Sequence, residues 1–153
     1  MSGFVYRHAQ PFVALWLGLT LGAIGSTLGI AASDDADATL GIVIALSSFA
    51  LALLLFGRLV IELHSDRLHW HLGFVGWPRW NVRLSNIAGM ERTRAAPWLD
   101  AGIRGRTRDR LYNVSIGGTA LKLTLTDGRS ITLGTPEPDR LAGFLEPRLS
   151  RRR

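Results

Sequence analysis

The sequence predicts an α+β membrane protein in which a two-helix transmembrane hairpin precedes an antiparallel β-sandwich with a C-terminal helix. Three observations predict this class. Two long stretches, 9–33 and 38–57, contain no charged side chain. Beyond residue 58, apolar side chains alternate with polar ones, which is the period of a β-strand. After residue 135 the apolar spacing becomes helical again.

The two uncharged stretches predict membrane-spanning helices at 12–32 and 38–57, joined by a loop at 33–37. A helix from Phe12 to Ala32 is about 30 Å long at about 1.5 Å per residue, which matches the hydrocarbon core of a bilayer. A cleaved signal peptide is the alternative interpretation of the first stretch, because Arg7 precedes it and residues 31–33 are small. Residues 40–56 would still cross the membrane in that case.

The charge distribution predicts that both ends of the hairpin are cytoplasmic. Of 18 Lys and Arg residues, only Arg7 precedes Arg58, whereas the loop at 33–37 holds three Asp residues and no basic residue. Positively charged flanks of membrane spans stay on the cytoplasmic side. We therefore expect a multi-pass protein of a bacterial inner (plasma) membrane, with residues 1–11 as a cytoplasmic N-terminal tail.

Small residues follow one face of each predicted span. Their spacings of four, three and four residues place them on one side of a helix. In the first span they are Gly18, Gly22, Gly25 and Gly29, and in the second they are Gly41, Ala45, Ser48 and Ala52. Such faces allow close van der Waals approach in lipid. We expect the two helices to pack antiparallel on each other, with homodimerisation through the same faces as the alternative.

Residues 58–150 are predicted to form a cytoplasmic domain of short strands closed by one helix. Alternating runs at 59–63 and 68–72 flank a turn at Ser65-Asp66, and further strands are expected at 80–84 and near Met90. Asp127-Gly128 between the runs 121–125 and 131–133 predicts a tight hairpin. The final helix is expected to have Thr135 as its cap, Pro136 at its first position, and an apolar face of Leu141, Phe144, Leu145 and Leu149. Residues 151–153 then form a basic tail.

This order of elements resembles small bacterial membrane proteins that carry a pleckstrin-homology-like domain. The residues that carry the resemblance lie between Leu59 and Leu149. They are Gly102-Ile103-Arg104, Leu111-Tyr112-Asn113-Val114-Ser115, Ala120 to Leu125, Asp127-Gly128-Arg129, Leu133-Gly134-Thr135, and Pro138 with Leu141. The resemblance implies a curved β-sandwich capped by a helix. It implies no particular activity, because members of the family are largely uncharacterised and a fold does not determine function.

A set of arginines forms the only candidate ligand surface that the sequence offers. Its members are Arg92, Arg94, Arg104, Arg106, Arg108 and Arg110. Near a membrane, each basic side chain attracts anionic headgroups by about 1 kcal/mol. A solvated loop is the alternative, because charge clusters mostly face solvent.

Catalytic, metal and cofactor sites find little support. The chain has no cysteine, which excludes disulfides, thiolate nucleophiles and Cys-ligated metals. His69 and His71 share one face of a predicted strand, but no third ligand is near, and zinc sites use three or four ligands. Nucleotide-binding and hydrolase motifs are also missing, so we expect neither an enzyme nor a cofactor.

We therefore expect a non-enzymatic, membrane-anchored binding or scaffolding module, for which an accessory subunit of a larger membrane complex is one form. The alternative is a domain that senses an anionic lipid surface through the basic loop. The expected partners are the lipid bilayer and either another membrane protein or a second copy of the chain. Nucleic acid is not expected: Trp70, Trp77, Trp80 and Trp98 could stack on bases, but no nucleic-acid motif accompanies them.

Overall fold

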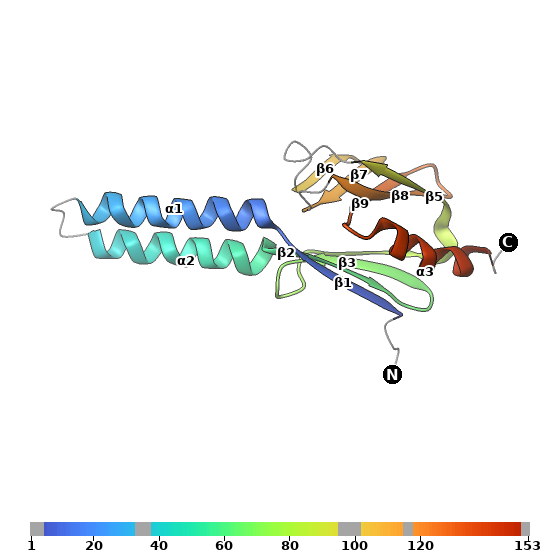
Figure 1. Ribbon diagram of the computed structural model, residues 1–153, viewed down its shortest axis with the longest axis horizontal. Coiled ribbons are helices and arrows are strands. Elements are labelled where there is room, and N and C mark those ends of the chain that lie inside the picture. The colour runs from blue at the N-terminus through green and yellow to red at the C-terminus, as the bar shows by residue number, and fades with distance from the viewer. Residues whose placement is uncertain (1–4, 33–37, 95–101, 115–117, 151–153) are drawn as a thin grey trace.

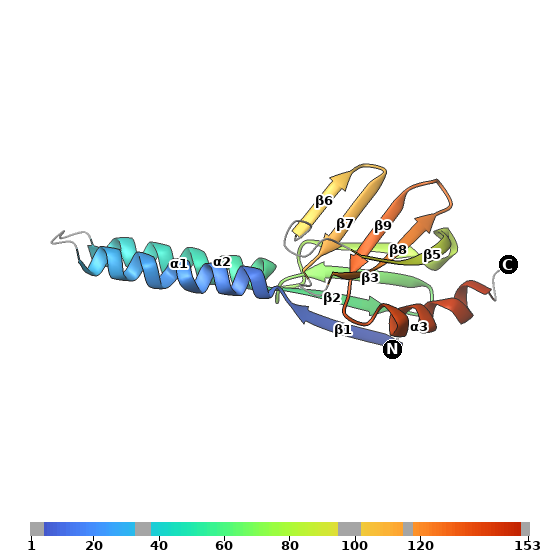
Figure 2. The ribbon, with the colours of Figure 1, turned by 45° about the horizontal axis from the view of Figure 1, so that its top comes forward.

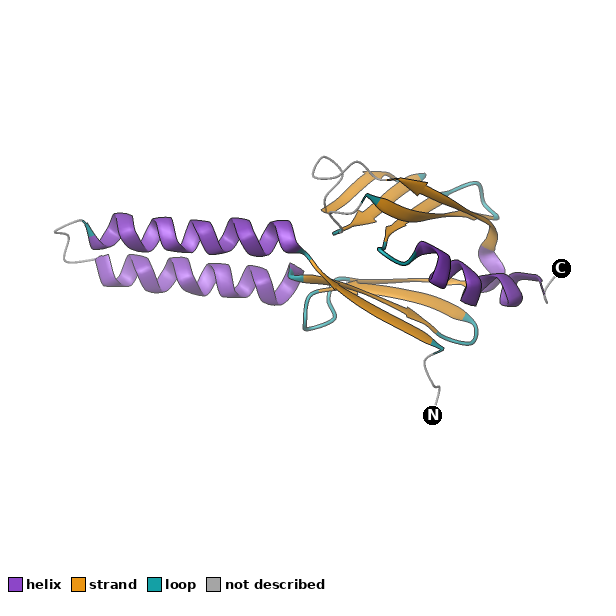
Figure 3. Ribbon diagram, in the orientation of Figure 1, coloured by secondary structure: helices purple, strands orange, loops and turns teal. Residues whose placement is uncertain are grey.

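The computed structural model describes residues 5–32, 38–94, 102–114 and 118–150, without the side chains of residues 31, 38 and 106. The loop at 33–37, Trp98 and the basic tail at 151–153 lie outside these residues. The molecule has two parts, a pair of antiparallel helices and a β domain from which that pair projects (Figure 1). Figure 3 shows that strands make up most of the β domain.

The helix pair consists of α1 (Val13–Ala31) and α2 (Ala38–Phe56), of 19 residues each. Each is about 28 Å long at the rise of an α-helix. Both are long and apolar enough to cross a membrane, judged by length and composition, and no residue of either apolar window is buried inside the molecule. Large apolar side chains such as Leu21 (68 % exposed), Leu28 (67 %) and Leu40 (60 %) therefore lack cover in the described chain.

The contact between α1 and α2 is centred on two large side chains that lie against glycines. A Cβ atom added at Gly22 would lie 3.5 Å from Cζ of Phe49, and one added at Gly41 would lie 3.5 Å from Cδ1 of Ile30. Ala45 and Ala52 also lie on the half-buried side of α2. These four small residues are the part of the predicted stripes that the helix pair uses.

The other four residues of the predicted stripes are exposed, and these are Gly18, Gly25, Gly29 and Ser48. A Cβ atom added at any of the three glycines would meet no atom within 4 Å. Ser48 instead donates its hydroxyl to the carbonyl oxygen of Ile44. The expected pairing of the two stripes is therefore not formed at these positions, and Gly22 lies against Phe49 where the stripes would have placed Ser48.

This geometry predicts a difference between two glycines of α1. Gly22→Ile places a branched side chain against the Phe49 ring, so we expect a lower melting temperature in detergent and a wider helix separation. Gly25→Ile is the matched control, because a Cβ there meets open space while the change in helix propensity is the same. Equal melting temperatures for the two variants would contradict this packing.

The helix pair continues directly into the β domain. Strand β1 (Tyr6–Pro11) precedes α1, and β2 (Arg58–Leu63) follows α2. The two strands pair antiparallel, from Pro11 opposite Arg58 to Tyr6 opposite Leu63. Residues 6–11 are thus a strand of the domain, which corrects the expectation of an N-terminal tail. The sequence did not show this, because six residues are too few for a clear alternation without knowledge of their partner.

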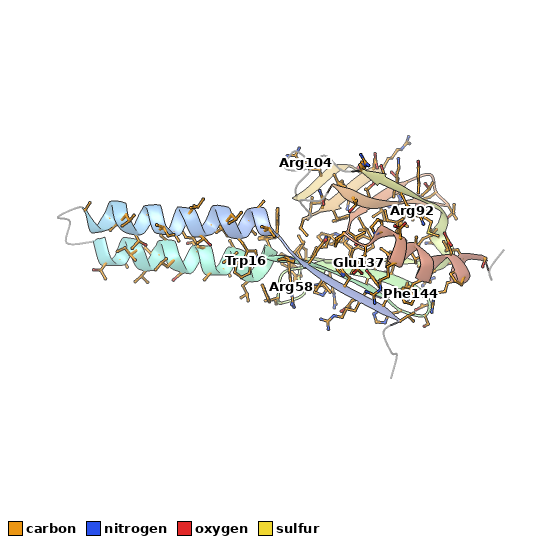
Figure 4. All side chains as sticks on the ribbon, viewed as in Figure 1. Trp16, Arg58, Arg92, Arg104, Glu137 and Phe144 are labelled. Carbon is orange, nitrogen blue, oxygen red and sulfur yellow. The ribbon has the colours of Figure 1, made fainter. Side chains whose placement is uncertain are left out.

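Contacts at the junction fix the end of the helix pair to the first sheet. The backbone N–H of Phe12 and the indole Nε1 of Trp16 both donate to the carbonyl oxygen of Gly57, at 2.9 and 2.8 Å. The backbone N–H of Phe74 donates to the carbonyl oxygen of Leu54 at 2.8 Å. The guanidinium of Arg58 lies 4.3 Å from the centre of the Phe74 ring. Figure 4 shows Trp16 and Arg58 together at this junction.

The first sheet has the order β1-β2-β3-β4, with β3 (Arg67–Leu72) and β4 (Arg79–Arg83), and all its pairs are antiparallel. A 3₁₀ turn (Leu84–Asn86) leads to the second sheet, whose order is β5-β8-β9-β7-β6. Its strands are β5 (Ile87–Arg94), β6 (Gly102–Arg106), β7 (Asp109–Asn113), β8 (Thr119–Leu125) and β9 (Ser130–Gly134). The second sheet is mixed rather than antiparallel, because β7 runs parallel to β9.

One core joins the two sheets and the terminal helix α3 (Pro138–Ser150). Leu59, Trp70, Leu123 and Leu141 are among its buried members and come from β2, β3, β8 and α3. The two predicted hairpins around residues 65–66 and 127–128 are confirmed by the pairings of β2 with β3 and of β8 with β9. The helix begins at Pro138 rather than Pro136, since the Thr135 hydroxyl accepts the Glu137 N–H at 3.2 Å in a turn before it.

Candidate ligand-binding cleft

A cleft of about 580 Å³ opens between the edge strand β4 of the first sheet and strands β7 and β9 of the second. Such a volume accommodates a small organic ligand. The side chains that line it come from five strands, from the 3₁₀ turn and from the turns between β6 and β7 and between β8 and β9. They are Trp70, Arg79, Trp80, Asn81, Val82, Arg83, Asn86, Thr107, Arg110, Tyr112, Leu125, Arg129, Ser130 and Ile131.

Three aromatic rings form the deep side of the cleft. The ring of Tyr112 lies 5.3 Å from that of Trp70 and 4.7 Å from that of Trp80, measured between centroids. Trp70 and Tyr112 are buried, whereas Trp80 is only half-buried. The indole Nε1 of Trp70 is buried without a hydrogen-bond partner among the described residues. The cleft thus combines a planar aromatic surface with an unpaired buried donor beside it.

Four arginines line the same cleft, and no Asp or Glu is among its lining residues. Arg129 is held by the carboxylate of Asp127, with its Nη2 at 2.7 Å from Oδ2. The hydrogen bond from the Arg129 side chain is the main cause of the lowered pKa of Asp127. Within the described ranges, Arg79, Arg83 and Arg110 have no ion pair. The cleft therefore has excess positive charge.

The edge position of β4 and strand alternation in β7 explain this lining. In β4, Trp80 and Val82 face inward, whereas Arg79 and Arg83 lie on the opposite, exposed face and border the cleft from the edge of the sheet. In β7, Arg110 and Tyr112 share one face because they are two residues apart. Arg110 stands opposite Ile131 of β9 in the register, which extends the cleft wall along the second sheet.

The structure distributes the five described arginines of the predicted set over separate places. Arg110 lines the cleft, and Arg92 pairs with Asp139 of α3, with Nε 2.5 Å from Oδ1. Arg94 and Arg104 line a separate groove of about 320 Å³ with Lys122. Arg108 is exposed in the turn between β6 and β7, and the side chain of Arg106 lies outside the described residues. The described members of the set thus lie in four settings: the cleft, an ion pair with α3, the separate groove and an exposed turn.

Sequence reasoning missed Arg79, Arg83 and Arg129 as site residues. The run RWNVR at 79–83 carries a signal for them, since it alternates two arginines with a tryptophan and a valine. That signal indicates one basic and one apolar face but not what stands opposite. Arg129 belongs to a hairpin turn, where a charged residue is ordinary.

The histidines do not extend the site. The ring of His69 lies 4.9 Å from that of His64, and burial is the main cause of the lowered pKa of His69. A search of the described residues finds no group of three His, Cys, Asp or Glu side chains placed to hold a metal ion. The ring of His71 lies beside Gly76, where an added Cβ atom would be 3.7 Å from its Nδ1 atom.

The arrangement can bind an anion by charge and an aromatic or apolar group by ring contact. Guanidinium groups match phosphate and carboxylate oxygens in pairs, and ring faces accept planar groups. No His, Asp, Glu or Lys is among the lining residues to act as a general base. A scan against models of known protein families found no match, and a search of curated proteins found no significant match.

Proposed function

We propose that this protein is a non-enzymatic, membrane-anchored binding module, with α1 and α2 crossing the bilayer and the β domain holding the binding surface. The observation that carries this proposal is the exposure of two apolar helices that emerge from paired strands of one sheet. In water such an apolar surface would be strongly unfavourable, whereas a bilayer solvates it. Because β1 and β2 pair, the start of α1 and the end of α2 lie on the same side of the bilayer, next to the β domain.

Aromatic residues at the junction support a membrane position at that level. Trp77 and Val75 are both 62 % exposed, and Phe74 is 47 % exposed. They lie in the loop between β3 and β4. The backbone N–H of Phe74 in this loop donates a hydrogen bond to the carbonyl oxygen of Leu54 in the last turn of α2. Tryptophan is enriched where a protein crosses from hydrocarbon to water. This loop would therefore lie in the headgroup region.

The domain side is proposed to be the cytoplasm of a bacterial cell, because the basic residues lie on that side and the acidic loop lies on the other. The two sheets and the terminal helix support the pleckstrin-homology-like sandwich that the sequence resembles. The parallel pair of β7 with β9 departs from a plain antiparallel arrangement, and β1 adds an antiparallel strand at the edge of the first sheet.

The scaffolding part of the proposal rests on the faces that the helix pair leaves open. Gly18, Gly25 and Gly29 of α1 are exposed, and a Cβ atom added at any of them would meet no atom within 4 Å. Another membrane protein or a second copy of the chain could approach such a face closely. An accessory subunit of a larger membrane complex would use it in this way.

Single-cysteine labelling in intact cells tests the topology. The chain has no cysteine, so Ala36→Cys in the loop and Ser85→Cys in the β domain each give one unique thiol. We expect a membrane-impermeant maleimide to label position 36 in intact cells and position 85 only after permeabilisation. Ser85 is exposed, so a missing signal there would not reflect burial. Labelling of both positions under the same conditions would overturn the proposed crossing, and the reverse pattern would overturn the cytoplasmic placement.

A second candidate function is the sensing of an anionic lipid surface. The groove with Arg94, Arg104 and Lys122 favours it, because Figure 4 shows Arg104 at the end of the β domain nearest the helices. Cationic side chains at that level attract anionic headgroups. Salt-sensitive retention of anionic lipid through purification would support this candidate, and equal retention of neutral lipid would count against it.

A further inference from the structure

We propose that the cleft between β4 and β7–β9 binds a soluble, phosphate-bearing small molecule with a planar ring. This inference names the ligand of the proposed binding module and so rests on that function. Arginines 79, 83 and 110 would hold the phosphate, and the half-buried ring of Trp80 would contact the planar group. The residues that carry it are distinct from the arginines of the groove with Lys122.

The charge of the cleft selects an anion. Arg79, Arg83 and Arg110 have no carboxylate partner among the described residues, in contrast to Arg7, Arg67, Arg92, Arg129 and Arg140, each of which has one. Three guanidinium groups that line one cleft without a carboxylate partner give it an excess of positive charge, which a group with two negative charges would neutralise. Phosphate presents several oxygens in the geometry that paired guanidinium N–H groups match.

The aromatic side selects the rest of the ligand. Trp80 is the ring that remains half-exposed over the buried Tyr112, at 4.7 Å and an interplanar angle of 53°. A planar group of the ligand could lie on its open face and be stabilised there by ring stacking. Asn81, Asn86 and Ser130 offer neutral polar groups that could bond ring substituents.

The position of the cleft selects a soluble source over the bilayer. Its lining includes Asn86, Thr107 and Arg129, which belong to turns at the ends of strands. Figure 2 shows the turns between β6 and β7 and between β8 and β9 well away from the helix pair. A headgroup within a membrane that surrounds the helices would lie near Arg79, two residues from Trp77, but would have to leave the bilayer surface to reach Asn86, Thr107 and Arg129.

Titration calorimetry on the full chain in phosphatidylcholine nanodiscs tests the inference with three probes. Adenosine 5′-diphosphate carries phosphate and ring, inorganic pyrophosphate carries phosphate alone, and adenosine carries the ring alone. We expect the diphosphate nucleoside to bind about tenfold more tightly than pyrophosphate, the gain that one stacked base of about 1–1.5 kcal/mol gives. Adenosine alone should bind at least tenfold more weakly than the nucleotide.

Variants assign the binding to the cleft. Arg83→Gln and Arg110→Gln should each weaken nucleotide binding about tenfold, the loss expected for one charge-assisted contact. Arg104→Gln is the matched control, since this exposed arginine also lacks an ion pair but lies outside the cleft. Trp80→Leu should remove the advantage of nucleotide over pyrophosphate, and Trp80→Phe should restore part of it in a folded protein. Equal loss with Arg104→Gln would overturn the assignment.

Two further outcomes decide the source of the phosphate. Nanodiscs that contain phosphatidylglycerol should leave the affinity for the nucleotide unchanged if the ligand is soluble. Displacement of the nucleotide by that lipid would overturn the soluble source and assign the cleft to a headgroup. Absence of binding by all three probes, with cysteine labelling that confirms the crossing, would overturn the cleft alone and leave the membrane anchor intact.

Discussion

Replacing residues 13–56 by Asn-Gly is expected to give a soluble, cooperatively folded β domain. The replacement removes both helices and joins Phe12 to Gly57, whose N–H···O hydrogen bond of 2.9 Å already closes the β1–β2 ladder. Asn-Gly favours the two-residue turns that connect such strands. We expect a monomer on size exclusion, a β-type circular dichroism spectrum and one sharp thermal transition.

The control for this design is residues 57–153 alone, without β1. It loses the burial of Tyr6, which is 5 % exposed, and the hydrogen bond of 2.6 Å from Gln10 Nε2 to the Gly134 carbonyl. The burial of one large side chain contributes about 1.5–3 kcal/mol and a buried hydrogen bond about 1 kcal/mol. A domain whose total stability is about 5–15 kcal/mol should then melt more than about 10 °C lower or aggregate through the exposed edge of β2.

Equal melting temperatures for the two soluble chains would show that β1 adds nothing to the domain. Failure of both to fold would instead show that the domain requires the helix pair, for example through Trp16 and its bond to Gly57. The designed domain would also allow ligand binding to be measured without detergent.

Gly73→Ala is expected to destabilise the junction between α2 and the β domain by at least about 2–3 kcal/mol. Gly73 has φ +68°, which costs an alanine roughly 1–2 kcal/mol. A Cβ atom there would also lie 2.3 Å from the carbonyl oxygen of Leu55 and 2.5 Å from that of Leu54. The chain must move away from the helix end to relieve this contact. That movement would break the bond from Phe74 N–H to Leu54.

Gly76→Ala in the same loop is the matched control. Its φ of +77° carries the same conformational cost, but an added Cβ would meet only the His71 ring, at 3.7 Å or more. Thermal unfolding in detergent should therefore show a small loss for Gly76→Ala and a distinctly larger one for Gly73→Ala. Similar losses would mean that the helix end does not press on this loop.

Local patterns in the sequence determined the elements of this protein. Two uncharged stretches predicted α1 and α2 within one or two residues, because apolar composition over about 20 residues leaves few alternatives. The alternation of 59–63, 68–72 and 121–125, with Asp127-Gly128, predicted hairpins whose turns lie where expected. These features depend on neighbours in the chain, so the chain itself reveals them.

The tertiary structure decided what depends on distant partners. Tyr6–Pro11 became a strand because β2, on the far side of two helices, offers an edge, and Gln10 reaches Gly134 across 124 positions. The parallel pairing of β7 with β9, and the position of β4 across from them, determine which arginines line the same cleft. Arg92 and Arg110 both belong to the arginine set that the sequence predicted as one surface. In the structure Arg92 forms an ion pair with Asp139 of α3, whereas Arg110 lines the cleft. Side-chain alternation assigns a residue to a face, but only the packing of whole sheets determines what that face meets.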